Sequence, residues 1–266
     1  MGFLDTVVSD KRREVAAKRA AHPLDRLRAQ ANASDVRDFR AAVSRPGAVI
    51  AEIKARTPTV ESFAQSRSLP AVAEAYARGG AAAISIVTDA ERFGTSLADV
   101  RPTRERVPLP VIAKDFVIDP YQVIEARAAG ADAVLLIVRL LDLDELRALL
   151  GLTGELGMAA LVETHSESEI LAALAAGAQI VGINNRDLDT MTVSLDTTRR
   201  LAHLVPRDVV LVSESGISSR DDIDDLASRG VGAFLVGGSL LAAGDPEAKL
   251  RELTRRTDPL GERARR

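Results

Sequence analysis

Polar residues that could do acid–base chemistry stand where short apolar runs of the chain end. Lys114 and Glu163 each close such a run, and Glu52 and Lys54 close another. Side chains alternate along a strand, so Glu52 and Lys54 would share one face. Further polar residues at such ends are Asn184, Glu214 and Ser215. If these runs are strands of one barrel, their carboxyl ends bring the polar side chains to one mouth, where barrels carry reacting groups.

The scarcity of lysine draws attention to these strand ends. The chain has 35 basic residues, of which only five are lysines, and two of those, Lys54 and Lys114, stand at predicted strand ends. Burial can tune a lysine to release a proton near neutral pH, whereas arginine stays charged. The pattern therefore favours acid–base chemistry. The alternative for any one position is a charge that only marks where a strand meets water.

The last two predicted strands are followed by sequences that could cradle a phosphate. In SESGI and VGGSL, the pairs Ser215-Gly216 and Gly237-Gly238 would let backbone N–H groups approach an anion. A short helix beginning near Ser239 would point its positive end at the same place. Barrels often hold a phosphate after these two strands, which favours a phosphate site over two ordinary turns.

Apolar residues stand close in sequence to the same polar strand ends. Aromatic residues make up only 3% of the chain, so Phe93 and Phe116 are conspicuous there. They could line a pocket for a flat ring, and packing in the core or against a helix is the competing interpretation. The candidate wall consists of Pro58, Phe93, Phe116, Leu135 and Leu188.

Short apolar runs alternate with segments of helical spacing along the whole chain. The runs recur at intervals of roughly 20 to 35 residues, which is typical of βα units. Several helical segments begin with Ser, Asp or Pro and end in Gly, residues that suit helix starts and stops. The predicted strands are 49–53, 82–87, 110–114, 133–138, 159–163, 180–184, 209–213 and 233–237.

Eight nearly continuous apolar strands predict an α/β fold of the (β/α)₈ type, a TIM barrel, because such strands are buried on both faces. An open doubly wound sheet is the alternative, but it would want a glycine-rich turn after the first strand, and EIKARTPT has none. We expect one domain over residues 1–266, with 1–46 as an N-terminal helical extension. Its predicted helices are 5–21, 24–31 and 34–43.

Composition excludes several kinds of site. The chain has no cysteine, which excludes disulfides, thiolate zinc sites and cysteine nucleophiles. His22, His165 and His203 show no paired metal spacing; we interpret them as surface or structural residues and expect no metal. The net charge of −3 argues against a nucleic-acid surface. The apolar runs are too short to span a membrane and the start lacks a signal peptide, so we expect a cytoplasmic protein.

Six motifs together resemble the indole-3-glycerol phosphate synthase family of tryptophan biosynthesis. They are EIK at 52–54, KDF at 114–116, LVETH at 161–165, GINNRDL at 182–188, SESGI at 213–217 and the closing VGGSL. The resemblance implies a cofactor-free barrel enzyme acting on 1-(2-carboxyphenylamino)-1-deoxyribulose 5-phosphate. Such an enzyme closes the pyrrole ring, loses carbon dioxide and water, and releases indole-3-glycerol phosphate. The implied partner is this small phosphorylated substrate, and we expect a monomer or a weak homodimer.

The resemblance also implies a role for each matching residue. Lys114 would be the general acid that activates the substrate carbonyl, Glu163 would transfer protons, and Lys54 would assist loss of hydroxide. Residues that would orient the reacting centre are Glu52, Asn184, Glu214 and Ser215. Arg186 matches an anion-binding arginine near the ring carboxylate. The implied phosphate cradle is Gly216, Gly237 and Gly238, and the implied ring wall is Pro58, Phe93, Phe116, Leu135 and Leu188.

The segment 55–61 departs from the family pattern. Members usually read EIKRASPSKG or similar, where this chain reads EIKARTPTVES. Two serines are replaced by Thr57 and Thr59, a lysine by Val60 and a glycine by Glu61. Because this loop covers the substrate in the family, two alternatives stay open. One is a paralogue acting on a ring-modified, anthranilate-derived substrate, and the other is a barrel that binds a phosphate ligand without turnover.

Overall fold

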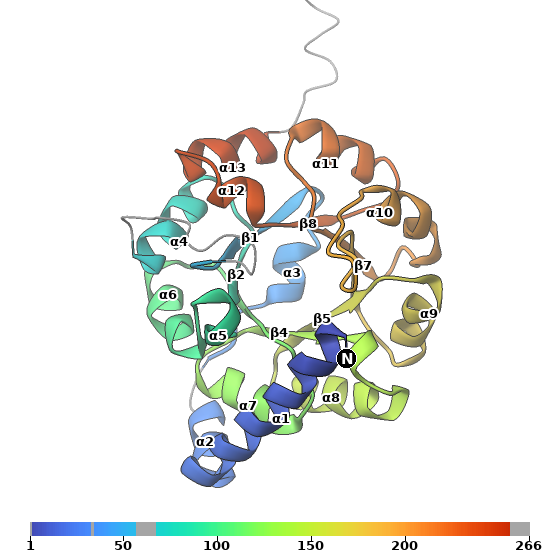
Figure 1. Cartoon of the computed structure of the whole chain (residues 1–266). Coiled ribbons are helices and arrows are strands. Elements are labelled where there is room, and N and C mark those ends of the chain that lie inside the picture. Colours follow the sequence, from blue (N-terminus) through green and yellow to red (C-terminus); the bar gives the residue numbers. More distant parts are fainter. Residues whose placement is uncertain (1, 33–34, 57–67, 256–266) are drawn as a thin grey trace, which may run out of the picture.

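Eight parallel strands pair in chain order into a closed barrel, with the last strand beside the first (Figure 1). The computed structural model describes residues 2–32, 35–56 and 68–255. The strands are β1 (Ala48–Ile53), β2 (Ala83–Val87), β3 (Val111–Lys114), β4 (Ala133–Ile137), β5 (Ala159–Thr164), β6 (Ile180–Asn184), β7 (Val210–Glu214) and β8 (Ala233–Val236). Every predicted strand is present with its ends within one residue, and closure of the sheet excludes the open doubly wound alternative.

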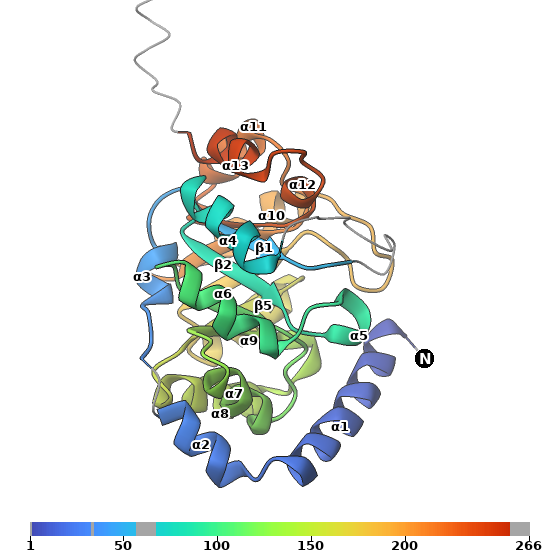
Figure 2. The same ribbon diagram turned by 90° about the vertical axis from the view of Figure 1, so that its left-hand side faces the viewer.

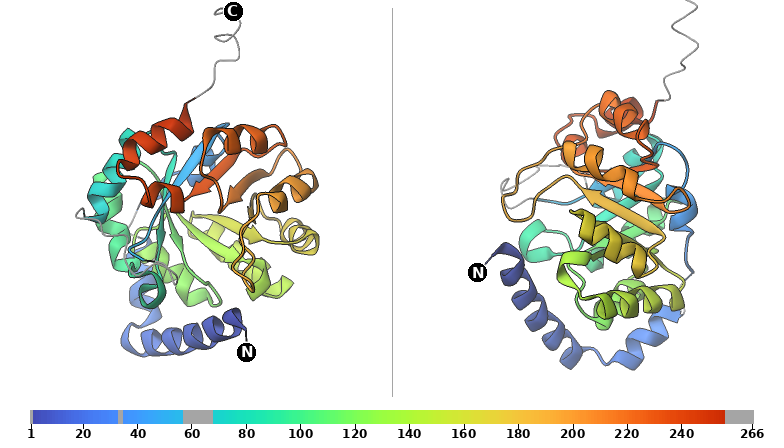
Figure 3. Two further views of the ribbon diagram at one scale, coloured as in Figure 1. Left: turned by 45° about the horizontal axis from the view of Figure 1, so that its top comes forward. Right: turned by 90° about the vertical axis from the view of Figure 1, so that its right-hand side faces the viewer.

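Helices surround the barrel, as the views in Figure 3 show. Several begin at an Asp or Ser whose side chain accepts a first-turn N–H, as Asp142 and Ser219 do. The longer helices after β1 are α4 (Leu69–Arg78), α6 (Val100–Arg106), α7 (Pro120–Ala128), α8 (Leu143–Glu155), α9 (Glu167–Ala175), α10 (Asp196–Leu201), α11 (Arg220–Ala227) and α13 (Pro246–Thr254). Short elements are α5 (Ala90–Phe93), α12 (Gly238–Leu241), η1 (Leu97–Asp99), η2 (Val138–Leu140) and η3 (Ala202–Leu204).

The strands divide the core into two layers. On β1, Val49, Ala51 and Ile53 pack in the layer between strands and helices. Ile50 packs in the barrel interior, so alternation places Glu52 on the interior side as well. The same alternation holds on β3, β5 and β7, where an interior Ile112, Leu161 or Val212 precedes the polar strand end by two residues. The period of two therefore aims Glu52, Lys114, Glu163 and Glu214 into the barrel.

The N-terminal extension touches both ends of the barrel. It consists of α1 (Phe3–Ala21), α2 (Leu24–Asn32) and α3 (Phe39–Val43). Phe39 and Val43 pack into the interior core and close the amino end, so α3 is seen inside the ring of strands in Figure 1. Figure 2 shows α1 at the opposite end, beside α5, and Arg92 of α5 forms an ion pair with Asp10 of α1. The structure thus has helices at the mouth and at the base.

The third N-terminal helix is shorter than predicted. Position 34 lies outside the described residues, residues 35–38 are not helical, and the helix begins at Phe39. The cause is Arg37, whose backbone N–H donates to Asp132 Oδ1 at 2.8 Å. Its guanidinium donates to the carbonyl oxygens of Arg104, Val107 and Leu109. Asp38 then caps the helix by accepting from the Ala41 N–H.

Among the described residues, no helix is long and apolar enough to cross a membrane.

Asp132 should be the main electrostatic anchor at the base of the barrel. It is fully buried and accepts from the backbone N–H groups of Arg37 and Val111 and from the Arg104 guanidinium. We expect Asp132→Ala to lower the free energy of unfolding by roughly 3–5 kcal/mol, because the donors are left buried without an acceptor. Urea denaturation measures this. Asp35→Ala removes an exposed partner of the same Arg104 and should leave the midpoint unchanged; equal losses in the two variants would contradict the assignment.

Candidate active site

Two lysines from different strands hold one buried carboxylate. Lys54 Nζ lies 2.5 Å from Glu52 Oε1, and Lys114 Nζ lies 3.6 Å from Glu52 Oε2. The Glu52 side chain is only 5% exposed. Glu52 lies in β1, Lys54 directly follows that strand, and Lys114 ends β3. Closure of the barrel therefore brings together two lysines that are 60 positions apart in the sequence. These are the two lysines that the sequence placed at strand ends.

The charges in this cluster favour an ionised Glu52 and a protonated Lys114. Burial by itself would raise the pKa of Glu52, but the charges of Lys54 and Lys114 and their hydrogen bonds lower it to about 2. Burial would lower the pKa of Lys114. The nearby carboxyl groups of Glu52, Glu163 and Glu214 outweigh burial and raise that pKa above its usual range. The expectation that burial tunes this lysine to release a proton near neutral pH is therefore wrong for Lys114, which is held as an ammonium donor.

Glu163 and Glu214 are buried in the same part of the barrel. Both side chains are almost inaccessible to water, at 1% exposure for each residue. Burial raises the pKa of Glu214 well above its usual range, the Glu163 charge adds to the rise, and Lys114 opposes it. Within the described residues neither carboxyl oxygen of Glu214 has a hydrogen-bond partner. The site therefore contains a buried carboxyl group whose pKa is raised, beside the side chains of Lys54 and Lys114.

Two glycines make room for the buried carboxyl groups. A Cβ added at Gly182 would overlap Glu214 Oε1, and one added at Gly237 would overlap Glu52 Oε1. The sequence analysis missed Gly182 and assigned Gly237 only to a phosphate cradle. The available signal was a glycine at an inward position of a strand, which marks a close approach of another group.

Asn185 holds the turn that follows β7. Its side-chain amide donates to Ser213 Oγ and to the carbonyl oxygens of Glu214 and Ser215. Ser215 has φ +65°, in the left-handed region that costs a non-glycine residue energy. The sequence analysis singled out Asn184 and missed Asn185. Asn185 and Ser213 are polar residues on the outward side of the strands, where the pattern is otherwise apolar, and that anomaly was the signal.

The predicted ring wall is partly deeper than expected. Leu135 is 2% exposed and packs in the barrel interior, where Phe116 also packs, so it lies below the rim rather than on it. Phe116 meets Phe3 of α1 edge-on, with ring centroids 6.2 Å apart. The N-terminal extension therefore reaches the side chain that follows Lys114 and Asp115. No feature of the sequence alone pairs Phe3 with Phe116.

Three other predicted substrate contacts, Phe93, Arg186 and Leu188, follow the carboxyl ends of β2 and β6. Phe93 ends α5, and its carbonyl oxygen accepts from the N–H groups of Ala55 and Arg56, so it anchors the start of the unusual segment. Leu188 is buried. Arg186 is exposed, and its guanidinium donates to the Met191 carbonyl oxygen at 3.1 Å. Pro58 and the substituted positions 57–61 lie outside the described residues.

The predicted phosphate turns are joined to each other. The short helix α12 begins at Gly238, one residue before the predicted start, and Ser239 Oγ donates to the Ile217 carbonyl oxygen at 2.9 Å. Gly216 has φ +82°, and a Cβ there would come within 2.8 Å of Val193. A Cβ at Gly238 would meet nothing within 4 Å. The turns after β7 and β8 are thus linked by a hydrogen bond.

Asn184 is buried, at 6% exposure, and ends β6 beside Glu214 of β7. Its side-chain oxygen accepts the Arg186 backbone N–H at 3.0 Å.

His165, which the sequence analysis interpreted as a surface or structural residue, is not at the surface. Its side chain is 5% exposed and lies beside Glu163. No group of three potential ligands capable of holding a metal occurs in the part of the chain that the structure describes.

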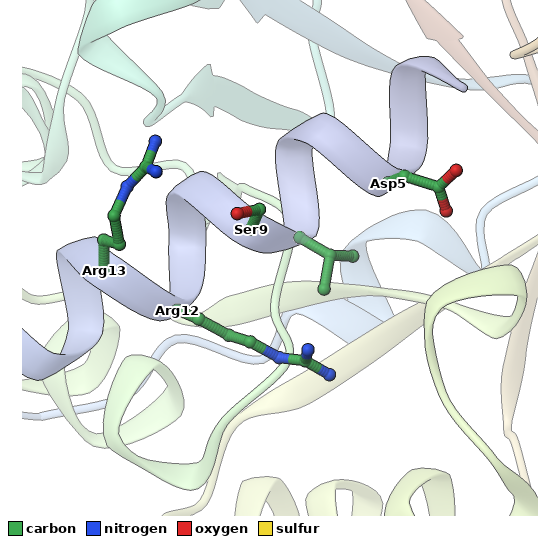
Figure 4. A pocket seen from close by; sticks show the side chains of 5 residues that line it. Asp5, Ser9, Arg12 and Arg13 are labelled. Atoms are coloured by element: carbon green, nitrogen blue, oxygen red, sulfur yellow. The ribbon is translucent and has the colours of Figure 1, made fainter. Parts of the chain in front are cut away.

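A separate hollow of about 540 Å³ lies along α1 and is lined by Asp5, Val8, Ser9, Arg12 and Arg13 (Figure 4). These residues come from one helix, and none belongs to the lysine–glutamate cluster. Arg13 is neutralised by an ion pair with Asp10 at 2.5 Å. The acid–base groups are therefore elsewhere, at the carboxyl ends of the strands.

A closed (β/α)₈ barrel with paired lysines and buried carboxyl groups at the carboxyl ends of its strands defines an α/β-barrel enzyme. Residues 4–253 match the family model described as indole-3-glycerol phosphate synthase. The chain belongs to the indole-3-glycerol phosphate synthase family.

Relatives of the chain carry the family name. It is 48% identical to the indole-3-glycerol phosphate synthase of a Nocardioides species over 259 residues, which cover 96% of this chain and 98% of that protein. It is 47% identical to the enzyme of the same name from Roseiflexus castenholzii, covering 94% of this chain and 97% of the relative. The relative from Mycobacterium ulcerans is 42% identical, with 94% and 93% covered.

Solved structures with low sequence identity share the fold. The 3-hexulose-6-phosphate synthase of Salmonella typhimurium aligns with a TM-score of 0.61 at 16% identity, covering 78% of this chain and 96% of that one. The thiamine phosphate pyrophosphorylase of Pyrococcus furiosus aligns with a TM-score of 0.58 at 16% identity, covering 80% and 94%. At this identity the likeness supports the barrel fold alone.

Glu214 should make stability depend on pH. Because its pKa is higher in the folded state, folding takes up a proton, so the stability is complete below the ordinary carboxyl pKa and is lost as pH rises toward the folded pKa. One such proton changes stability by about 1.4 kcal/mol per pH unit. Urea denaturation at pH 5 to 8 should show that the free energy of unfolding of Glu214→Gln increases relative to that of the wild type as pH rises. Glu105→Gln removes an exposed carboxyl as control; a wild type and Glu214→Gln with parallel profiles would contradict the buried acid.

Gly237→Ala should displace the Glu52 carboxylate from between its lysines. We expect a loss of unfolding free energy of roughly 1–3 kcal/mol, which is typical of overpacking. Gly244→Ala is the matched control, because a Cβ there meets nothing within 4 Å. Urea denaturation of the two variants checks this. If Gly237→Ala is as stable as Gly244→Ala, the glycine is not needed to accommodate Glu52.

Proposed function

We propose that this protein acts as an indole-3-glycerol phosphate synthase, closing the pyrrole ring of 1-(2-carboxyphenylamino)-1-deoxyribulose 5-phosphate with loss of carbon dioxide and water. The observation that carries the proposal is the buried cluster in which Lys54 and Lys114 share Glu52, beside Glu163 and Glu214. The family match over residues 4–253 supports the substrate class. The reaction needs proton donors and acceptors on one small molecule, and this cluster supplies both kinds of group.

Lys114 is the proton donor for ring closure in this proposal. A carbon of the aromatic ring attacks the substrate carbonyl, a carbon–carbon bond forms, and the carbonyl oxygen takes a proton from the Lys114 ammonium. The negative charges of Glu52 and Glu163 support this role, because they raise the pKa of Lys114 and so favour its ammonium form in the resting site. The developing alkoxide is thereby neutralised in a place from which water is largely excluded.

Decarboxylation and dehydration complete the reaction. The bond to the carboxylate carbon breaks, and its electron pair neutralises the iminium formed during closure. In the dehydration, Glu163 takes a proton from the ring carbon beside the nitrogen, and the electron pair of that C–H bond forms the double bond of the pyrrole ring. The C–O bond breaks at the same time, and the hydroxyl group takes a proton from Lys54 and leaves as water. Glu52, fixed between the two ammonium groups, sets the position of both lysines. Asn184, Glu214 and Ser215 orient the reacting centre.

The remaining predicted residues bind the substrate in this proposal. Arg186 faces the ring carboxylate as an anion-binding group, and the backbone N–H groups of Gly216, Gly237 and Gly238 hold the phosphate. Gly237 lacks a side chain because the buried Glu52 carboxyl group occupies that space. The part that Gly237 plays in phosphate binding therefore rests on its backbone N–H alone. The aromatic ring packs against Pro58, Phe93, Phe116, Leu135 and Leu188.

Substitution of the acid–base groups tests the function. We expect Lys114→Ala and Glu163→Gln to lower kcat/KM by about 10²–10⁴-fold, the usual size of a lost general acid or base. Formation of indole fluorescence from the substrate measures turnover, and circular dichroism checks folding. Lys249→Ala is the control, because among the described residues Lys249 pairs only with Glu252, on the outer helix α13. Full activity in Lys114→Ala would overturn its role.

The wild-type assay separates the proposal from the alternatives that the segment 55–61 raises. Turnover of the unsubstituted substrate with the highest kcat/KM among ring-substituted analogues supports the proposal. A clear preference for a substituted ring would identify a paralogue. Binding of the phosphorylated substrate without any product would identify a barrel that binds its ligand without turnover.

A further inference from the structure

His165 lies buried between two carboxyl groups, one of them the Glu163 of the acid–base cluster. It directly follows β5, and its side chain is 5% exposed. Nε2 lies 3.4 Å from Glu163 Oε1, and Nδ1 lies 3.3 Å from Glu169 Oε2 on α9. An imidazole that contacts a carboxyl group through each of its nitrogens can connect the two.

Glu169 is fixed as an ionised acceptor. Its Oε2 also accepts the His165 backbone N–H at 2.8 Å, and its Oε1 lies 3.3 Å from Arg139. Burial would raise the pKa of Glu169, but the hydrogen bonds from His165 and the Arg139 charge bring it below its usual value. An ionised carboxylate can only accept, so the contact with Nδ1 requires the proton to be on Nδ1.

The proton on Nδ1 leaves Nε2 in a defined state. In a neutral imidazole, Nε2 is then a bare lone pair. Among the described residues it has no hydrogen-bond partner, and it faces the Glu163 oxygen at 3.4 Å. A lone pair and a carboxylate oxygen repel each other in a buried site. One proton between them removes the repulsion, whether it resides on Glu163 or on Nε2.

We propose that His165 is a positioning residue that orients Glu163 and exchanges one proton with it. The inference rests on the proposed function, in which Glu163 moves protons during catalysis. In the exchange the Glu163 O–H bond breaks as the Nε2–H bond forms. The positive charge of the imidazolium is balanced by Glu169, and the reverse step returns the proton. No other reactant is required.

The charged groups around this pair come from several elements. Glu163 on β5, Glu169 on α9 and Arg139 on η2 face the imidazole or its partner carboxylate. Arg139 also lies 3.4 Å from Asp189 in the loop after β6. On the far side of Glu163 are Lys114 and Glu214, whose protonation is linked to its charge. Removal of the imidazole should therefore change the pH dependence of turnover as well as its rate.

The kinetic test uses His165→Asn, which keeps an N–H near the Nδ1 position for Glu169 and removes Nε2 together with Cε1. We expect kcat to fall by roughly 10–100-fold with KM within about twofold of the wild type, because the lost group acts on proton transfer rather than on binding. The pH profile of kcat should shift, and the urea midpoint should not. His203→Asn, at an exposed histidine on η3, should match the wild type in all three measurements. Wild-type kcat and pH profile in His165→Asn would overturn the proposal.

A second measurement is independent of turnover and so separates failure of this inference from failure of the proposed function. In ¹⁵N–¹H spectra of the full chain, we expect the His165 ring to carry a proton on Nδ1 throughout. Glu163→Gln should change the titration of Nε2 and leave the His203 signals unchanged. A ring protonated only on Nε2, or a Nε2 titration that Glu163→Gln does not alter, would overturn the proposal. If the spectra agree but the wild type makes no indole-3-glycerol phosphate, the proposed function fails and the proton-sharing pair stands.

Discussion

The site depends on one buried carboxylate, Glu52, that two lysines neutralise from two sides. Removing an ammonium group from water costs several kcal/mol unless a negative partner meets it. Glu52 serves Lys54 and Lys114 at once, and its own pKa falls to about 2 as a result. With Glu52 in place both lysines can stay charged at the mouth of the barrel. The raised pKa of the buried Glu214 limits the negative charge gathered there.

The fold provides the geometry that this interaction needs. Alternation along the parallel strands turns the polar ends inward, and ring closure in strict chain order brings β1 and β3 within reach of each other. Space is then the limiting factor. Gly182 and Gly237 lack side chains where the Glu214 and Glu52 carboxyl groups must fit. Asn185 holds the left-handed Ser215 that shapes the next turn. The buried lysines and carboxyl groups are thus supported by residues that have no ionisable side chain.

The N-terminal extension belongs to the same electrostatic arrangement. Lys11 of α1 is buried, lies 2.8 Å from Asp115, the residue after Lys114, and 3.6 Å from Asp89. These carboxylates outweigh burial and raise the pKa of Lys11 above its usual range. Lys11 is therefore a third of the five lysines that lies at the mouth, and its role is structural, because it holds α1 to the barrel by ion pairs. Scarcity of lysine pointed to the correct region of the molecule, but it did not distinguish a proton donor from an ion-pair anchor.

The amino-acid sequence by itself determined the eight strands, their polar ends and the barrel, because periodicity and alternation are local properties that survive any uncertainty about packing. The motifs from EIK to VGGSL were sufficient to indicate the family. Only the tertiary structure decided that the pKa values of Lys114 and Glu214 are raised, that the His165 side chain is buried beside Glu163, and that Leu135 lies below the rim. It also decided that the third helix begins at Phe39. The raised pKa values and the start of the third helix depend on groups that are distant in sequence, and the separations between those groups exist only once the barrel has closed. The burial of His165 and Leu135 likewise requires the packing of the closed barrel.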